Sequence, residues 1–115
     1  MKKPRKTVPI LQPEIDKMIE SLAPGCGFKG YVTNTQRGLS YYEGFFSVPL
    51  WAWETGPEYF TYYVAHELSH QIRYKRFGDS GVHDEHFYSV FKEVCPVHLQ
   101  HYELNYKKSF AKYAA

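Results

Sequence analysis

The segment from Pro57 to Phe77 constrains this chain most, because it has the pattern of one long amphipathic helix. Four apolar residues recur at every fourth position and so share one helical face: Phe60, Val64, Leu68 and Ile72. The sequence T-G-P-E at 55–58 has the form of a capping box, and Gly78 is a typical C-terminal cap. A helix of this length needs another layer of structure against its apolar face.

Shorter patterns lie on both sides of this segment. Apolar spacing predicts a helix over 12–23, and three runs separated by glycine predict strands. After the long helix, two further apolar patterns predict C-terminal helices, the first of which stops before Pro96. The predicted strands are 28–34, 39–42 and 45–53, and the C-terminal helices centre on Phe87 to Val94 and on Leu99 to Tyr113. This order predicts an α+β fold with an N-terminal helix and a small three-stranded sheet.

The chain has 115 residues, which suits one domain. We expect a basic flexible arm over 1–9 and a single domain over 10–115. The net charge of +2 does not by itself call for nucleic acid or a membrane. Cys26 and Cys95 form no C-x-x-C pair, which favours two reduced thiols, and no stretch approaches a membrane span. We therefore expect a cytoplasmic monomer.

Residues 66–70 read H-E-L-S-H, an H-E-x-x-H motif in the middle of the predicted long helix. Residues four positions apart share a helical face, with Cβ atoms about 5–6 Å apart. The imidazoles of His66 and His70 can therefore both reach one Zn²⁺ ion at about 2.0–2.1 Å. The Glu67 carboxylate can reach a water on that ion without binding the metal, which is the position of a general base. Without a metal, these histidines would be surface or packing residues.

A catalytic zinc needs a third protein ligand and an open fourth position. In the longer motif H-E-x-x-H-x-x-G-x-x-H, the third histidine lies six residues after the second. Here Arg76 occupies that position and Arg73 replaces the glycine, which excludes that class. A turn after the long helix lets the chain return to the metal. Four residues are then candidates for the third ligand: His83, His86 and the carboxylates Glu85 and Glu93.

This part of the sequence resembles the SprT-like zinc metallopeptidases. The similar features are H-E-L-x-H at 66–70, a helix end with lysine and aromatic residues that closes in Phe77 and Gly78, and His83 with Phe87 four positions later. The resemblance covers about residues 40–95.

The stretch H-D-E-H-F-Y at 83–88 also resembles the related WLM-type domains, and both groups are zincins. The resemblance implies a zincin-like core with three zinc ligands and one general base: His66, His70, His83 and Glu67. His86 could then contact the substrate or support a ligand, although a polar residue in an exposed first turn is the simpler interpretation. Asp84 stands where the SprT pattern has glycine, and no C-terminal cysteine ribbon is present.

The expected function is that of a zinc-dependent endopeptidase acting on a protein or peptide substrate. The alternative is a catalytically weak, zinc-containing, nucleic-acid-associated binding module of the same fold. Weak DNA association would involve the basic arm residues Lys2, Lys3, Arg5 and Lys6, although a solvated terminus explains them more simply. The strand at 45–48 could bind an extended substrate at a sheet edge, or be an ordinary sheet strand. A tyrosine could assist the oxyanion, but the sequence selects none.

Overall fold

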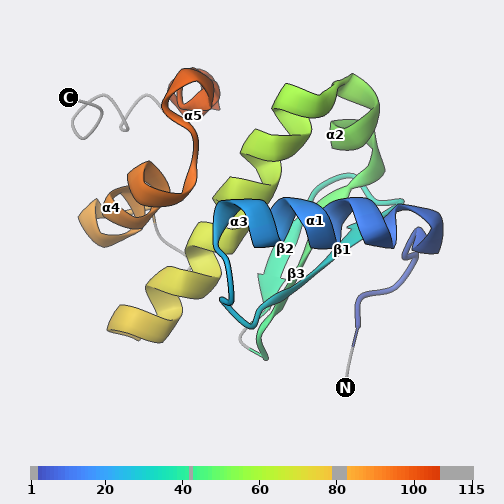
Figure 1. The fold of residues 1–115 in the computed structure, drawn as a ribbon, viewed down its shortest axis with the longest axis horizontal. Coiled ribbons are helices and arrows are strands. Elements are labelled where there is room, and N and C mark those ends of the chain that lie inside the picture. The colour runs from blue at the N-terminus through green and yellow to red at the C-terminus, as the bar shows by residue number, and fades with distance from the viewer. Residues whose placement is uncertain (1–2, 42, 79–82, 107–115) are drawn as a thin grey trace.

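The computed structural model describes residues 3–41, 43–78 and 83–106. It confirms the α+β class, with helices before and after a small mixed sheet (Figure 1). In chain order the elements are the 3₁₀ turn η1 (Pro9–Leu11), α1 (Gln12–Leu22), β1 (Lys29–Thr33), β2 (Leu39–Tyr41), β3 (Phe45–Pro49), α2 (Leu50–Thr55), α3 (Pro57–Phe77), α4 (Glu85–Val94), the 3₁₀ turn η2 (Val97–Leu99) and α5 (His101–Tyr106).

The central strand of the sheet is β3, because the strand order is β1–β3–β2. β1 runs parallel to β3, with Gly30 opposite Phe46, whereas β2 runs antiparallel to it, with Ser40 opposite Phe46. Both edges of β3 are thus paired. The possibility that the strand at 45–48 offers a free edge to substrate is therefore wrong. Among the described strands the edge strands are β1 and β2, and residues 6–8 pair along β1, which leaves the edge of β2 for a substrate.

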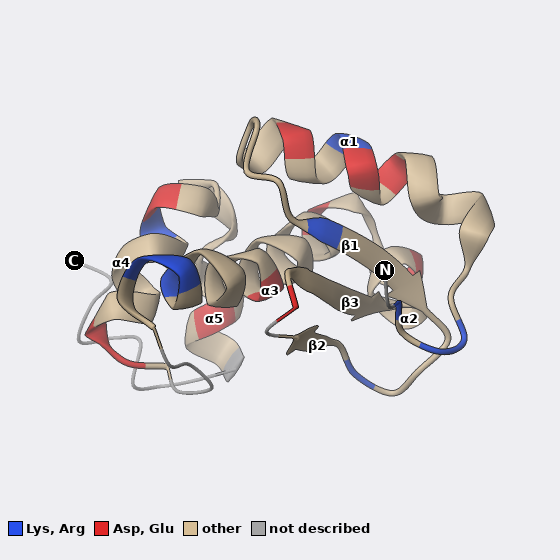
Figure 2. Ribbon diagram, turned by 90° about the horizontal axis from the view of Figure 1, so that it is seen from below, with Lys and Arg blue, Asp and Glu red and all other residues tan. Residues whose placement is uncertain are grey.

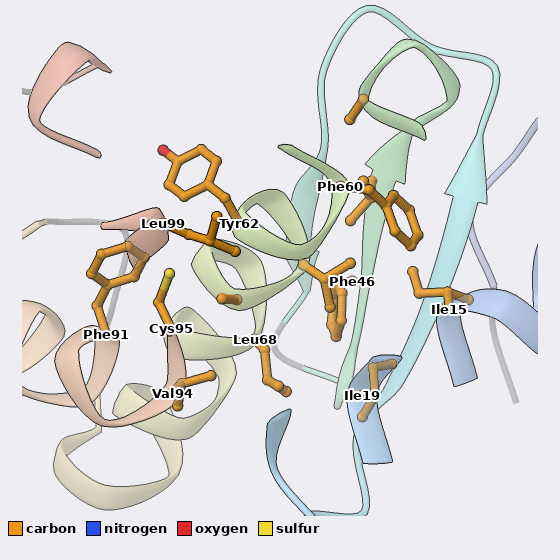
Figure 3. Close-up of a cluster of buried hydrophobic side chains, with 14 of the residues drawn as sticks. Ile15, Ile19, Phe46, Phe60, Tyr62, Leu68, Phe91, Val94, Cys95 and Leu99 are labelled. Atoms are coloured by element: carbon orange, nitrogen blue, oxygen red, sulfur yellow. The ribbon is translucent and has the colours of Figure 1, made fainter. Parts of the chain in front are cut away.

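α3 runs through the middle of the molecule, with the sheet and α1 on one side and α4 on the other (Figure 1). Apolar side chains from both sides meet on it in one continuous core (Figure 3). Ile15 of α1 and Phe46 of β3 pack on one side, Phe91 of α4 packs on the other, and Leu68 of α3 is buried between them. This burial fixes the helix that carries the H-E-x-x-H motif.

The predicted bounds of the long helix are confirmed at both ends, but the predicted capping box is wrong. α3 ends at Phe77, and its C-cap Gly78 has a φ of 70°, which suits glycine. At its start the N-cap is Gly56, with no side-chain cap. The Thr55 hydroxyl donates instead to the carbonyl of Trp51, at 2.7 Å. Thr55 is the last residue of α2, so its hydroxyl bonds within the last turn of α2 and does not cap α3.

The third predicted strand, 45–53, is too long. β3 ends at Pro49, which has no N–H to continue the ladder. The chain then enters α2, whose Ala52 is fully buried while its neighbour Trp51 is 41% exposed. The alternating sizes of these side chains imitate a strand, but they belong to one turn of helix packed on α3.

The N-terminal end of the described chain pairs with the sheet, and the C-terminal end adds two short helical elements. Residues 6–8 of the basic arm are hydrogen-bonded along β1: the Val8 N–H donates to Val32 O and the Asn34 N–H donates to Lys6 O, both at 2.8 Å. Thr7 also pairs with Thr33 as an isolated bridge. At the C-terminal side, the fourth predicted helix is described as η2 and α5, while the part of that prediction beyond Tyr106 lies outside the described residues.

Both cysteines are free thiols, as expected. Burial, with a smaller effect of nearby Glu103, raises the pKa of Cys95 to about 12, which keeps this thiol protonated and unreactive. In the described part of the chain no helix is long and apolar enough to cross a membrane.

Candidate metal centre

Three histidines converge at the side of α3. The ligand atoms of His66, His70 and His83 all lie within 4.8 Å of one another. The Nε2 atoms of His66 and His83 are 3.2 Å apart. Two nitrogens bound to the same tetrahedral zinc at about 2.0–2.1 Å would be about 3.3 Å apart. The spacing of these side chains therefore fits a shared metal ion, and the fold brings together the three residues that the resemblance implied.

The ring nitrogen Nδ1 of His66, on the side away from His83, is hydrogen-bonded to a carboxylate that we did not identify from the sequence. Glu103 of α5 is fully buried, and its Oε1 lies 2.7 Å from Nδ1 of His66. The Tyr62 hydroxyl donates to the same oxygen at 2.8 Å. Because Nδ1 is engaged, Nε2 of His66 is the nitrogen that faces His83. Ligating histidines commonly have such an outer carboxylate, which fixes the tautomer and the ring orientation.

The charge of Glu103 follows from these contacts. Burial alone would raise its pKa, but the hydrogen bond and charge of His66 and the hydrogen bond of Tyr62 outweigh burial and lower it. The carboxyl group is therefore ionised at neutral pH and can accept a hydrogen bond from the N–H at Nδ1 of His66. Burial, followed by the charges of His66, His83 and Arg73, lowers the pKa of His70 to about 3. His70 is thus a neutral imidazole at neutral pH, the form that binds a metal.

Arg73, near the end of α3, binds the residues on both sides of the segment that leads to His83. Its guanidinium donates to the carbonyl of Gly78 and to both carboxylate oxygens of Asp84, at 2.6 Å for Nη2 and 3.3 Å for Nε. Asp84 also accepts the Phe87 N–H at 2.9 Å and so caps α4. One buried arginine therefore ties the end of one helix to the start of the next, and His83 lies directly before that cap.

The Asp84 side chain is the residue that departs from the SprT pattern, and the structure gives it a role. The hydrogen bond from Arg73 is the main reason that its pKa falls to about 2, assisted by the Phe87 N–H and opposed by burial. We did not assign Asp84 this role from the sequence, although aspartate is a preferred residue at a helix N-cap and stands shortly before the predicted third helix. Arg73 was noted there only as the residue that excludes the longer histidine motif.

Glu67 follows His66 on α3, interacts with its charge and is 7% exposed. Ser40 of β2 contacts it twice, with its Oγ 3.1 Å from Glu67 Oε1 and 2.8 Å from the Glu67 carbonyl oxygen. Burial raises the pKa of Glu67, although the charge of His66 and the Ser40 hydrogen bond oppose that rise. A carboxylate with a raised pKa holds a proton more readily, which suits a group that must accept and return one.

The other candidates for a third ligand lie outside the cluster. The group of possible ligands that the described residues form contains neither Glu85 nor Glu93 nor His86. Glu93 pairs instead with Arg76, at 2.9 Å, on the surface. His86 is exposed and stacks on Phe77, with ring centroids 4.0 Å apart.

Two tyrosines that could have assisted an oxyanion have structural partners. The Tyr62 hydroxyl holds Glu103, and the Tyr63 hydroxyl accepts the Gly38 N–H at 2.9 Å. Both hydroxyls therefore serve to position other groups.

Comparison of the chain with protein-family models, with curated proteins and with solved structures finds no match. The SprT-like resemblance therefore rests only on the sequence features named above, at 66–70, 77–78, 83 and 87.

Proposed function

We propose that this protein is a zinc-dependent peptidase with a zincin-like core, similar to the SprT-like metallopeptidases. The observation that carries the proposal is the convergence of His66, His70 and His83, together with the buried carboxylate of Glu67, which follows His66 in sequence and interacts with its charge. Three imidazoles with an adjacent, non-ligating carboxylate form the ligand set of a hydrolytic zinc site that leaves one position open.

The donor atoms fit zinc on chemical grounds. Three imidazole nitrogens suit a borderline-soft divalent ion. The Glu103 carboxylate behind His66 supplies the negative charge that raises the basicity of this ligand. When bound, Zn²⁺ would act as a Lewis acid and make water a better nucleophile.

The residues of the chain would then move one proton. Glu67 accepts a proton from the attacking water at its carboxylate, and it returns this proton to the amine nitrogen as the C–N bond of the peptide breaks. Burial raises the pKa of Glu67, which favours the protonated form that exists between the two transfers. Ser40 keeps the Glu67 carboxylate oriented from the strand β2.

An extended substrate would pair with β2, the edge strand beside the catalytic residues. Ser40 projects from β2 toward Glu67, so a chain added to this edge would pass close to the general base. Main-chain pairing of this kind gives affinity with little dependence on sequence. The proposed substrates are therefore peptides and unfolded protein segments.

Zinc content measured by elemental analysis tests the site. One zinc per chain is expected for the wild type, and the variants His66→Ala, His70→Ala and His83→Ala should each lose it. Glu85→Gln and Glu93→Gln are matched controls that should keep it. Loss of zinc in a glutamate variant, with full zinc in His83→Ala, would contradict the proposed ligands. If zinc-loaded wild type cleaves no unfolded protein, with or without single-stranded DNA, the binding-module alternative replaces the peptidase.

A further inference from the structure

The sheet has a second face, which α1 and α3 do not cover. Side chains alternate along a strand, so Ser40, which reaches Glu67, and Phe46 project to the helix side, whereas their neighbours Tyr41 and Phe45 project to the other side. On that other side lies a hollow of about 500 Å³. Its floor and walls come from the three strands, the basic arm and the loop before β2, with Thr33, Leu39, Tyr41, Phe45 and Ser47 among the lining residues.

Three basic side chains gather around this hollow: Lys3, Arg5 and Arg37. All three are exposed, and none has a hydrogen bond or an ion pair with another residue in the part of the chain that the structure describes. One carboxylate, Glu43, also lines the hollow, so the local balance is three positive charges less one, or +2. An excess of positive charge in one hollow favours the binding of an anion there. Figure 2 shows basic segments of the arm and of the loop before β2 beside the sheet, on the side away from α1.

The inner wall of the hollow is apolar and aromatic. Tyr41 stacks on Phe45, with ring centroids 4.5 Å apart and an interplanar angle of 20°. Tyr41 is half-buried, whereas Phe45 below it is 3% exposed. An aromatic ring supported in this way is a platform for a further flat ring. The hydroxyls of Thr33 and Thr35, 2.7 Å apart, add hydrogen-bonding groups.

We propose that this hollow binds a mononucleotide, with the phosphate between the basic side chains and the base on the Tyr41 side. A phosphate monoester carries a charge of about −2 at neutral pH, which balances the local charge. The volume falls within the range of about 300–1,000 Å³ that is typical of small-molecule sites. A single nucleotide fits better than a long strand, because the three basic residues surround one hollow and do not form a track. This site is on the opposite face of β2 from Glu67, and it is independent of the proposed peptidase activity.

Calorimetric titration of the full chain with AMP, adenosine and inorganic phosphate tests the proposal. AMP should bind at least about tenfold more tightly than either of the others, because only AMP has both the charged and the flat part. Arg37→Gln and Arg5→Gln should each weaken AMP binding about tenfold or more. Tyr41→Leu should weaken AMP binding and leave phosphate binding unchanged. The matched control is Arg76→Gln, because Arg76 is an exposed arginine paired with Glu93, and it should have no effect.

Several results would overturn the proposal. AMP binding that is absent, equal to that of adenosine, or equally weakened by Arg37→Gln and Arg76→Gln would show that the basic residues do not form the site. A single-stranded oligodeoxyadenylate whose affinity rises with its length would show a nucleic-acid track in place of a mononucleotide site. Because Arg5 and Arg37 are exposed, unchanged melting of both variants would show that weaker binding does not come from unfolding.

Discussion

Oε1 of Glu103 lies 2.7 Å from Nδ1 of His66, and this contact joins α5 to the H-E-x-x-H motif across 37 positions of sequence. The Tyr62 hydroxyl donates to the same oxygen from one turn earlier on α3. The candidate metal centre therefore consists of three imidazoles and of two buried residues, Glu103 and Tyr62, that support one of them. The position of α5 and the orientation of His66 depend on each other through this carboxylate.

Replacing this carboxylate should weaken zinc binding. For Glu103→Ala we expect zinc affinity to fall about 10–100-fold, because His66 loses the group that fixes its tautomer and ring orientation. Competition with a chelating dye, well below the melting temperature, measures this. Tyr62→Phe removes only the hydroxyl that contacts Glu103, so it should reduce affinity less. Wild-type zinc affinity in Glu103→Ala would mean that the carboxylate does not support the site.

Arg73 should support zinc binding without touching the metal. Arg73→Gln removes the link between Gly78 and Asp84, so His83 is held less firmly and zinc affinity should fall. Arg76→Gln is the matched control, since it breaks only an exposed pair, which is typically worth about 0–1 kcal/mol. The same dye competition measures the zinc affinity of both variants, and we expect Arg73→Gln to bind zinc more weakly than Arg76→Gln. Equal affinities would leave His83 positioned by other contacts.

Acid should remove the contribution of the ion pair between Arg73 and Asp84 to the free energy of unfolding. The pKa of Asp84 in the folded protein is about 2, below its unfolded value of about 3.9. A depressed carboxyl pKa contributes stability that is present above the unfolded value and is lost as the pH falls through the folded value. Urea unfolding at pH values between about 4 and 2 should show this loss in the wild type and a smaller one in Asp84→Asn. Parallel curves for both proteins would assign the acid sensitivity to other groups.

Much of α3 and its motif could be predicted from the sequence. The bounds at Pro57 and Phe77 were predictable because a four-residue apolar repeat agrees with Pro near the start and Gly78 at the end. Chain length allowed His83 to reach the motif but left His86, Glu85 and Glu93 open as well, and the SprT-like resemblance selected His83. What failed depends on tertiary contacts: the run from Leu50 to Trp53 suits a buried strand or a buried helix turn equally well, and packing against α3 decides between them.

The outer layer of the site was beyond prediction for a different reason. Glu103 lies in a short polar helix, and nothing in its neighbours marks it as buried. Its partner is set by how α5 folds back on α3. Glu85 and Glu93 were nearer in sequence and equally acidic, but α4 holds them away from the histidines. Likewise, a central β3 follows from the pairing order, which the strand patterns alone do not contain.

The contact between α1 and the sheet should depend on the absence of a side chain at Gly30. A Cβ there would lie 2.8 Å from both Ile19 Cδ1 and Phe46 Cζ, and both of these side chains are buried. Gly30→Ala should therefore destabilise the fold by about 1–3 kcal/mol through overpacking. Thermal and urea unfolding measure the change. Adding Ile19→Val removes one of the crowded atoms, so the double variant should be more stable than the sum of the two changes predicts. Simple additivity would place the strain elsewhere.

The most direct measurement compares cleavage of an unfolded protein by zinc-loaded wild type and zinc-loaded Glu67→Gln. Glutamine keeps the shape of the side chain and can still accept a hydrogen bond from Ser40, but it cannot take a proton. Zinc content and melting temperature should therefore be equal in the two proteins, while the rate of cleavage should fall about 10²–10⁴-fold in the variant. Equal rates in both proteins, or no cleavage by the zinc-loaded wild type, would contradict a peptidase in which Glu67 is the general base.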